Sequence, residues 1–156
     1  FSALIRFWLD RHLMFRRLLG ILQTEARAAS DKAMDTQTYA AHLSRYGSMF
    51  VGELHGHHTI EDQHYFPKIS GLERTTAHGF DILDRDHHAL DGHIGGFAEQ
   101  ANAVLAAIQK GQSSVDEIGR LGDGLVDMER FLDRHLTDEE ELVVPILLKH
   151  GSGGWE

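Results

Sequence analysis

Histidine is unusually frequent in this chain, and several histidines fall into a repeated pattern with glutamate. The 156 residues include 12 histidines, which are scattered rather than gathered in one run. His57 is followed four positions later by Glu61, and His135 is followed four positions later by Glu139. On an α-helix such side chains stand one turn apart on the same face, so both can reach a shared point. Imidazole together with carboxylate suits iron, manganese or zinc, so the pattern indicates a metal site.

The repetition extends beyond these two pairs. A proline lies ten positions after the histidine of each pair, at Pro67 and Pro145. A further histidine precedes each pair, His12 in the first half and His87 in the second, and each has an apolar residue three positions later. The two halves therefore share one plan, in which a histidine on one helix precedes a His-x-x-x-Glu on the next.

Helical periodicity dominates the sequence and predicts helices over about residues 2–29, 36–66, 76–110 and 114–150. Because proline disfavours helix at the residue before it, we expect the second helix to end at Phe66 and residues 67–75 to form a linker. Gly111 is expected to stop the third helix. Short connections between long helices predict an all-α, up-down-up-down antiparallel four-helix bundle, forming a single domain over residues 1–156.

Composition narrows the class of protein. The formal net charge of −9 disfavours nucleic-acid binding, which needs clustered Lys and Arg. The absence of cysteine excludes disulfides, zinc fingers and iron–sulfur clusters, and we expect a cytoplasmic location. The apolar N-terminal segment is interrupted by charges at helical spacing, so we expect an amphipathic helix and no membrane partner. The chain does not begin with Met, so residues upstream of Phe1 can be missing.

Four of the histidines fall at nearly one level of such a bundle. Counted from the shared loops at about 1.5 Å per residue, His12, His57, His87 and His135 agree with their neighbours within about 6 Å. They also point towards the core, as the residues around His87 illustrate. At helical spacing it is flanked by an apolar stripe of Phe80, Leu83, Leu90, Ile94 and Phe97.

A core of this kind needs compensating positive charge. An unpaired ionised carboxylate or imidazolium costs several kcal/mol in an apolar interior. Four imidazoles and the carboxylates of Glu61 and Glu139 are sufficient for two divalent ions bridged by the carboxylates. We therefore expect a dinuclear metal site inside the bundle.

These residues together resemble the hemerythrin-like, or HHE cation-binding, domain family, over nearly the whole chain from His12 to Pro145. The resemblance implies a left-handed four-helix bundle and a non-haem centre of two Fe ions that binds a small oxidant, such as O2, H2O2 or NO. By position it implies two imidazoles for each iron and two bridging carboxylates. His12 and His57 would serve one iron, His87 and His135 the other, and Glu61 and Glu139 would bridge.

The third helix departs from the pattern of oxygen-carrying hemerythrins, which have His-x-x-x-His there and so a third imidazole on one iron. Here the positions four before and four after His87 are Leu83 and Asp91. That iron would be less crowded or would take an unexpected ligand. Oxygen carriers also place the last carboxylate at +5, which is Glu140, whereas the internal repeat favours Glu139. Both departures favour sensing or redox chemistry over bulk oxygen transport.

The other candidate residues are weighed against simpler roles. His64 lies three residues after Glu61 and is the best candidate for a fifth imidazole or a supporting group. Arg16 can pair with a carboxylate near the site or extend to solvent. Tyr46 and Tyr65 could supply a phenolate, although core packing is the simpler role. The remaining histidines that we considered are expected to be solvated: His55, His58, His88, His93 and His150.

Three functions compete with the leading one, which is a di-iron protein that binds or reacts with a small oxidant. A ferritin-like di-iron oxidase needs two Glu-x-x-His motifs, and only one is present, at Glu61 and His64. A zinc hydrolase is disfavoured because no HExxH motif occurs. A non-enzymatic iron store or sensor module remains open, and whether the protein is an enzyme is uncertain.

Overall fold

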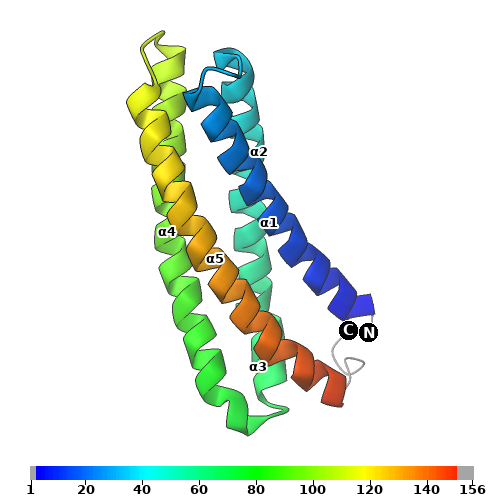
Figure 1. Cartoon of the computed structure of the whole chain (residues 1–156). Helices are drawn as coiled ribbons and strands as arrows, with labels where there is room; N and C mark the ends of the chain where they lie inside the picture. The colour runs from blue at the N-terminus through cyan, green and yellow to red at the C-terminus, as the bar shows by residue number, and fades with distance from the viewer. Residues whose placement is uncertain (1–2, 151–156) are drawn as a thin grey trace.

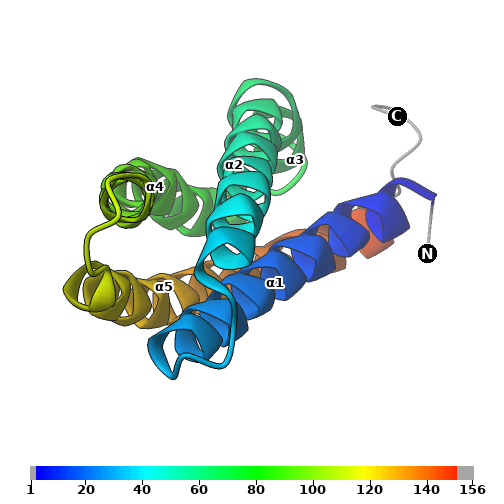
Figure 2. The same ribbon diagram turned by 90° about the horizontal axis from the view of Figure 1, so that it is seen from above.

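The computed structural model describes residues 3–150, which form four long helices in an antiparallel bundle. The helices are α1 (Ala3–Ser30), α2 (Thr36–Ile60), α4 (Ala77–Gln109) and α5 (Val115–His150). α1 packs against α2 and α5, and α4 packs against the same two helices, which closes the ring seen from above in Figure 2. The predicted all-α four-helix bundle is confirmed, and no strand occurs within residues 3–150.

Local sequence signals set the turns between the helices. The Asp35 carboxylate caps α2 by accepting a hydrogen bond from the backbone N–H of Thr38, at 2.9 Å. α4 ends at Gln109, and Gly111 lies just beyond its C-cap with a φ of +69°, which suits a residue without a Cβ atom, as the sequence predicted. Of the predicted boundaries, the start at Ser2 lies outside the described residues, and the third and fourth helices begin and end within about one residue of expectation.

The second helix does not end at Phe66, so the predicted boundary and linker are wrong. A π-helix, η1 (Glu61–Tyr65), follows α2 directly, and α3 (Phe66–Ser70) continues the rod before the 3-10 turn η2 (Arg74–Thr76). The Phe66 N–H donates to the carbonyl of Glu61, five residues back. Pro67 therefore lies in the first turn of α3, where a missing N–H is tolerated.

Pro145 does not end its helix either. It lies inside α5, which continues to His150. The predicted fourth helix, which runs through Pro145 to residue 150, agrees with this, and both prolines lie beyond the histidine–glutamate pairs.

Two apolar clusters fill the bundle, with a polar layer between them. The larger cluster includes Phe15, Leu54, Leu90 and Leu132, and it extends towards the two tight loops. The smaller cluster lies at the other end, around α3. Its buried members are Ile5, Trp8, Phe66, Ile69, Phe80, Leu83, Val143, Ile146 and Leu147. Along the chain the predicted site residues fall at or beside the boundaries between the segments that supply the two clusters. No helix within the described residues is long and apolar enough to cross a membrane.

The larger cluster should carry much of the stability. Leu125 is completely buried in α5, whereas Leu148 on the same helix is 59% exposed. We expect Leu125→Ala to lower the free energy of unfolding by about 2–5 kcal/mol, because it removes buried methyl groups and leaves a cavity. Leu148→Ala should change it by about 0.5 kcal/mol or less. Urea unfolding of both variants would measure this, and equal losses would contradict the assignment of the core.

Candidate metal centre

The structure brings all six predicted site residues into the interior of the bundle. Glu61 and Glu139 are both completely buried, although each carries a carboxyl group. The histidines come one from each long helix and are also buried: His12, His57, His87 and His135. Such a layer of ionisable groups between two apolar clusters requires a specific compensating interaction.

The residues form two groups, each able to hold one metal ion. In the first, one nitrogen each of His12 and His57 and one oxygen each of Glu61 and Glu139 lie within 4.8 Å of one another. The second has the same spacing and consists of His58, His87, His135 and Glu139. Glu139 thus belongs to both groups, and His58 enters a site that the sequence pattern did not assign to it.

Each glutamate directs its two oxygens towards different groups. Glu139 Oε1 lies 3.1 Å from His12 Nε2, whereas Glu139 Oε2 lies 3.0 Å from His135 Nε2. Glu61 Oε2 lies 3.3 Å from His57 Nε2, and Glu61 Oε1 lies 3.5 Å from His87 Nε2. Each carboxylate therefore faces histidines of both groups, and Glu139, rather than Glu140, is the interior residue of the acidic run.

An outer set of carboxylates orients three of the histidines. His12 Nδ1 donates to Glu140 at 2.7 Å, and His87 Nδ1 donates to Asp62 at 2.7 Å. His135 Nδ1 donates to Asp86 at 3.1 Å. When Nδ1 carries the proton, Nε2 of each ring keeps its lone pair towards the site, as in carboxylate–histidine–metal arrangements. In the metal-free structure Nε2 of His12 lies 3.1 Å from Nε2 of His57, whereas Nε2 of His87 and of His135 has no hydrogen-bonding partner.

Two arginines hold these outer carboxylates from the surface. Arg16 donates to Glu140 at 3.0 Å, which decides between the two roles considered for this residue. Arg134 donates to both oxygens of Asp86, at 2.9 and 3.3 Å. The rings of His12 and His135 are therefore each held by a carboxylate that is itself held in place by an arginine.

The hydrogen-bond inventory fits a bound cation. Within residues 3–150, seven buried side-chain polar atoms lack a hydrogen-bonding partner, and six of them lie in this layer. A buried polar atom without a partner costs about 1–3 kcal/mol. A cation accepts electron pairs from nitrogen and oxygen together, so it satisfies the whole set. The six atoms are His58 Nε2, His87 Nε2, His135 Nε2, Glu61 Oε1 and both carboxylate oxygens of Glu139.

The charge states of the metal-free site follow from the same contacts. Burial lowers the pKa of His57 and His87, but the nearby glutamates outweigh it and raise each pKa to about 9. Burial and the Glu139 carboxylate raise the pKa of Glu61 to about 7. Burial also opposes ionisation of Glu139, but the Glu61 carboxyl and the surrounding imidazoles hold its pKa well below the usual range. Protons thus occupy the positions that a metal would take.

His58 is the exception among the site histidines. Burial, together with the neighbouring His87, lowers its pKa to about 2, so its imidazole is neutral. The prediction that His58 is solvated is wrong, since only 7% of the residue is exposed. The spacing of three residues from His58 to Glu61 was a usable signal, because i and i+3 also share a helix face.

His64 is also placed differently from expectation. It is exposed, and it is not a member of either group. The reason is the π-helix at Glu61–Tyr65, whose wider turn breaks the period of 3.6 residues on which the expectation relied.

The remaining residues behave more simply. His55, His88 and His150 are exposed, as expected, whereas His93 is half-buried with its ring 4.5 Å from that of Phe131. Tyr46 packs against the larger apolar cluster.

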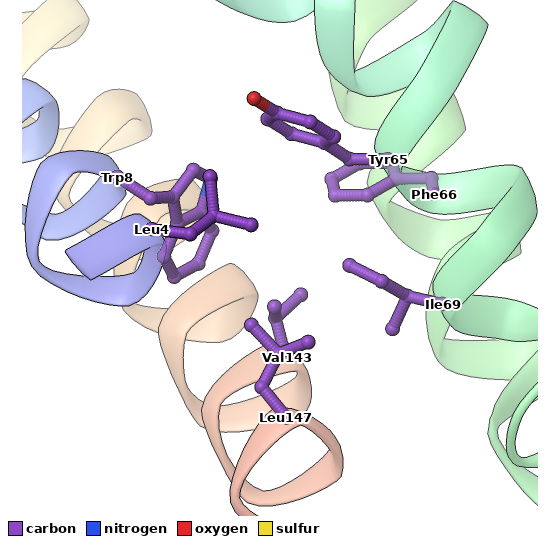
Figure 3. A pocket seen from close by; sticks show the side chains of 7 residues that line it. All are labelled: Leu4, Trp8, Tyr65, Phe66, Ile69, Val143 and Leu147. Carbon is purple, nitrogen blue, oxygen red and sulfur yellow. The ribbon is translucent and has the colours of Figure 1, made fainter. Parts of the chain in front are cut away.

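A small apolar cavity borders the site at the end of the bundle near α3. Its volume is about 10 Å³, and side chains from α1, α5 and the segment around α3 converge on it in Figure 3. Trp8 connects the cavity with the site, because its indole N–H donates to Glu61 Oε2 at 3.0 Å. Tyr65 also lines it, as do Leu4, Phe66, Ile69, Val143 and Leu147.

The fold and this interior layer define a class: a helical-bundle protein with a histidine–carboxylate cation site. The chain belongs to the hemerythrin family, since the family description "Hemerythrin HHE cation binding domain" matches residues 3–147. The suspected resemblance is thereby confirmed. No curated protein and no solved structure matches the chain significantly.

The metal-free protein should lose stability as the pH rises above neutrality. Because the folded state holds the protons of His57 and His87 more tightly than the unfolded state, their contribution is complete below pH 6.5 and is lost as the pH passes about 9. Thermal unfolding with chelator present, from pH 6.5 to 9.5, would measure the fall. His57→Gln should reduce it, and the exposed-site variant His55→Gln should not. A midpoint independent of pH would contradict these charge states.

Proposed function

We propose that the protein holds two iron ions in this layer and binds or reacts with a small oxidant. His12 and His57 would hold one ion, His87 and His135 the other, and Glu61 and Glu139 would bridge them. One observation carries the proposal. Six buried nitrogen and oxygen atoms without a hydrogen-bonding partner belong to residues of the two candidate ligand groups. Imidazole and carboxylate ligands without thiolate suit iron, and the family is a cation-binding one.

Bound iron would supply the redox change and an open coordination position for a small ligand. The chain's own residues would determine which ligands arrive and how protons move. Apolar side chains above and below the layer exclude bulk water from Glu61 and Glu139. Trp8 N–H holds one oxygen of Glu61 and so fixes the orientation of that carboxylate. Glu61, whose pKa in the metal-free protein is raised to about 7, would release its proton when the ions bind.

The surroundings favour a small, neutral ligand such as O2 or NO over a bulky substrate. The cavity behind Trp8 is apolar and about the size of one water molecule. Hydrogen peroxide, which needs hydrogen-bonding partners on its route, would fit the polar groove near His58 better. We propose sensing or redox chemistry in the cytoplasm rather than bulk oxygen transport.

A ferritin-like oxidase is the weaker alternative. That architecture needs Glu-x-x-His motifs that face the core, and here His64 of the one such motif is exposed. A non-enzymatic iron store or sensor module is distinguished from a catalyst by the experiment with added oxidant described below.

Metal content tests the ligand assignment. After anaerobic reconstitution with ferrous iron, the wild-type protein should bind two ions per chain. His57→Ala or Glu61→Ala should weaken binding at least about tenfold, because each removes a proposed ligand from a buried site. The exposed-site variant His88→Ala should bind like wild type. Elemental analysis after gel filtration gives the result, and equal metal content in all variants would refute the assignment.

The fate of added oxidant separates the functions. We expect the ferrous protein to change its absorption spectrum on exposure to O2, NO or H2O2. A change reversed by removing the ligand indicates binding or sensing, and sustained consumption of peroxide indicates catalysis. Iron accumulating far beyond two per chain would indicate storage and contradict the proposal.

A further inference from the structure

We propose that His58 is a third imidazole ligand of the metal ion held by His87 and His135, supplied by α2 rather than by α4. The inference rests on the proposed function, since it assigns a further ligand to the same centre. It makes the two ions chemically unequal, with three imidazoles around one and two around the other.

The position of the His58 ring is that of a ligand. Its Nε2 atom is buried, has no hydrogen-bonding partner and lies 4.0 Å from Glu61 Oε1. The ring centre is 4.1 Å from that of His87 and 5.4 Å from that of His135. One ligand atom of each of these three histidines and of Glu139 falls within 4.8 Å of the others, close enough to share one ion.

Two adjacent residues on α2 can serve different ions because α2 lies between α1 and α4. Successive residues on an α-helix are rotated by about 100° from one another. His57 contacts the α1 side, with its ring 5.0 Å from that of His12 and 5.2 Å from that of Phe15. His58 contacts the α4 side, at His87.

α4 offers no second imidazole to this group. Leu83, one turn before His87, is buried in the smaller apolar cluster, and Asp91, one turn after it, is exposed. His58 occupies the space beside His87 instead. A purely structural role would leave a polar nitrogen buried without a partner, which an apolar side chain of similar size would avoid.

A surface groove gives access to this position. It has a volume of about 90 Å³ and is lined by mostly exposed residues together with His58 and His87. His55 lines the same groove from the same helix but is exposed. It therefore provides a matched control for changes at His58, and the groove provides a route for added imidazole.

The test compares His58→Ala with His55→Ala in the full chain, with iron binding and Mössbauer spectra as readouts. Wild type and His55→Ala should bind two ions and show two unequal iron environments. His58→Ala should bind one of the two ions at least about tenfold more weakly, with the spectrum of that ion altered. Added imidazole should restore both, because it can occupy the space left by the side chain. Circular dichroism checks folding, and His58→Gln replaces the alanine variant if helix content falls.

The outcomes separate this inference from the proposed function. If wild type binds two ions and His58→Ala matches His55→Ala in affinity and spectrum, His58 is not a ligand, although the dinuclear site stands. Loss of metal that imidazole does not restore would mean a packing role and would also overturn the inference. If wild type binds no metal, the proposed function fails and this inference fails with it.

Discussion

Two carboxyl groups completely shielded from water, Glu61 and Glu139, are the constraint on which the rest of the structure depends. Without compensation, their desolvation would oppose folding by several kcal/mol. In the metal-free protein the compensation is protons on the neighbouring imidazoles, as the raised pKa values of His57 and His87 indicate. Protons satisfy only some of the directions in which these oxygens can interact, so unpartnered atoms remain. The helices of the bundle hold these unpartnered nitrogen and oxygen atoms in place, where a cation can contact them.

The four-helix bundle can bury these carboxyl groups because the polar layer between the two apolar clusters is narrow. Apolar clusters on both sides keep water out, while the outer carboxylates and arginines lie at the helix surfaces. The π-helix adds a local adjustment at Glu61, where it changes the direction of the following residues. Asp62 then contacts Nδ1 of His87, and His64 is turned outward. π-helical turns are often found at functional sites, where such a change of register serves a ligand set.

The sequence was sufficient for the fold and for the level of the site, because both depend on regular helical geometry. Periodicity gave the four helices, and counting from the loops placed His12, His57, His87 and His135 in one layer. The errors arose where regular geometry fails or where contacts are between helices. The end at Phe66 was wrong because Pro67 lies in the first turn of α3 and does not stop the rod. The role of His64 was wrong because the π-helix could not be anticipated from an assumed period of 3.6 residues. The bonds of Asp62 and Asp86 to histidines on other helices depend on side-chain directions that spacing does not encode.

The internal repeat also explains how the two halves differ. It pairs His57 with His135 and His12 with His87, and on those positions the site is symmetric. The residue after the paired histidine is His58 in one half and Leu136 in the other, and both are buried. Likewise, the residue four before the preceding histidine is Trp8 in one half and Leu83 in the other. Trp8 donates to Glu61, whereas both oxygens of Glu139 lack a hydrogen-bonding partner. The polar departures from the repeat therefore act on different sides of the layer: Trp8 joins the first group to the apolar cavity, and His58 adds an imidazole to the second. Two helix pairs related by the repeat can in this way present two unlike ligand groups, because these two interior positions differ between them.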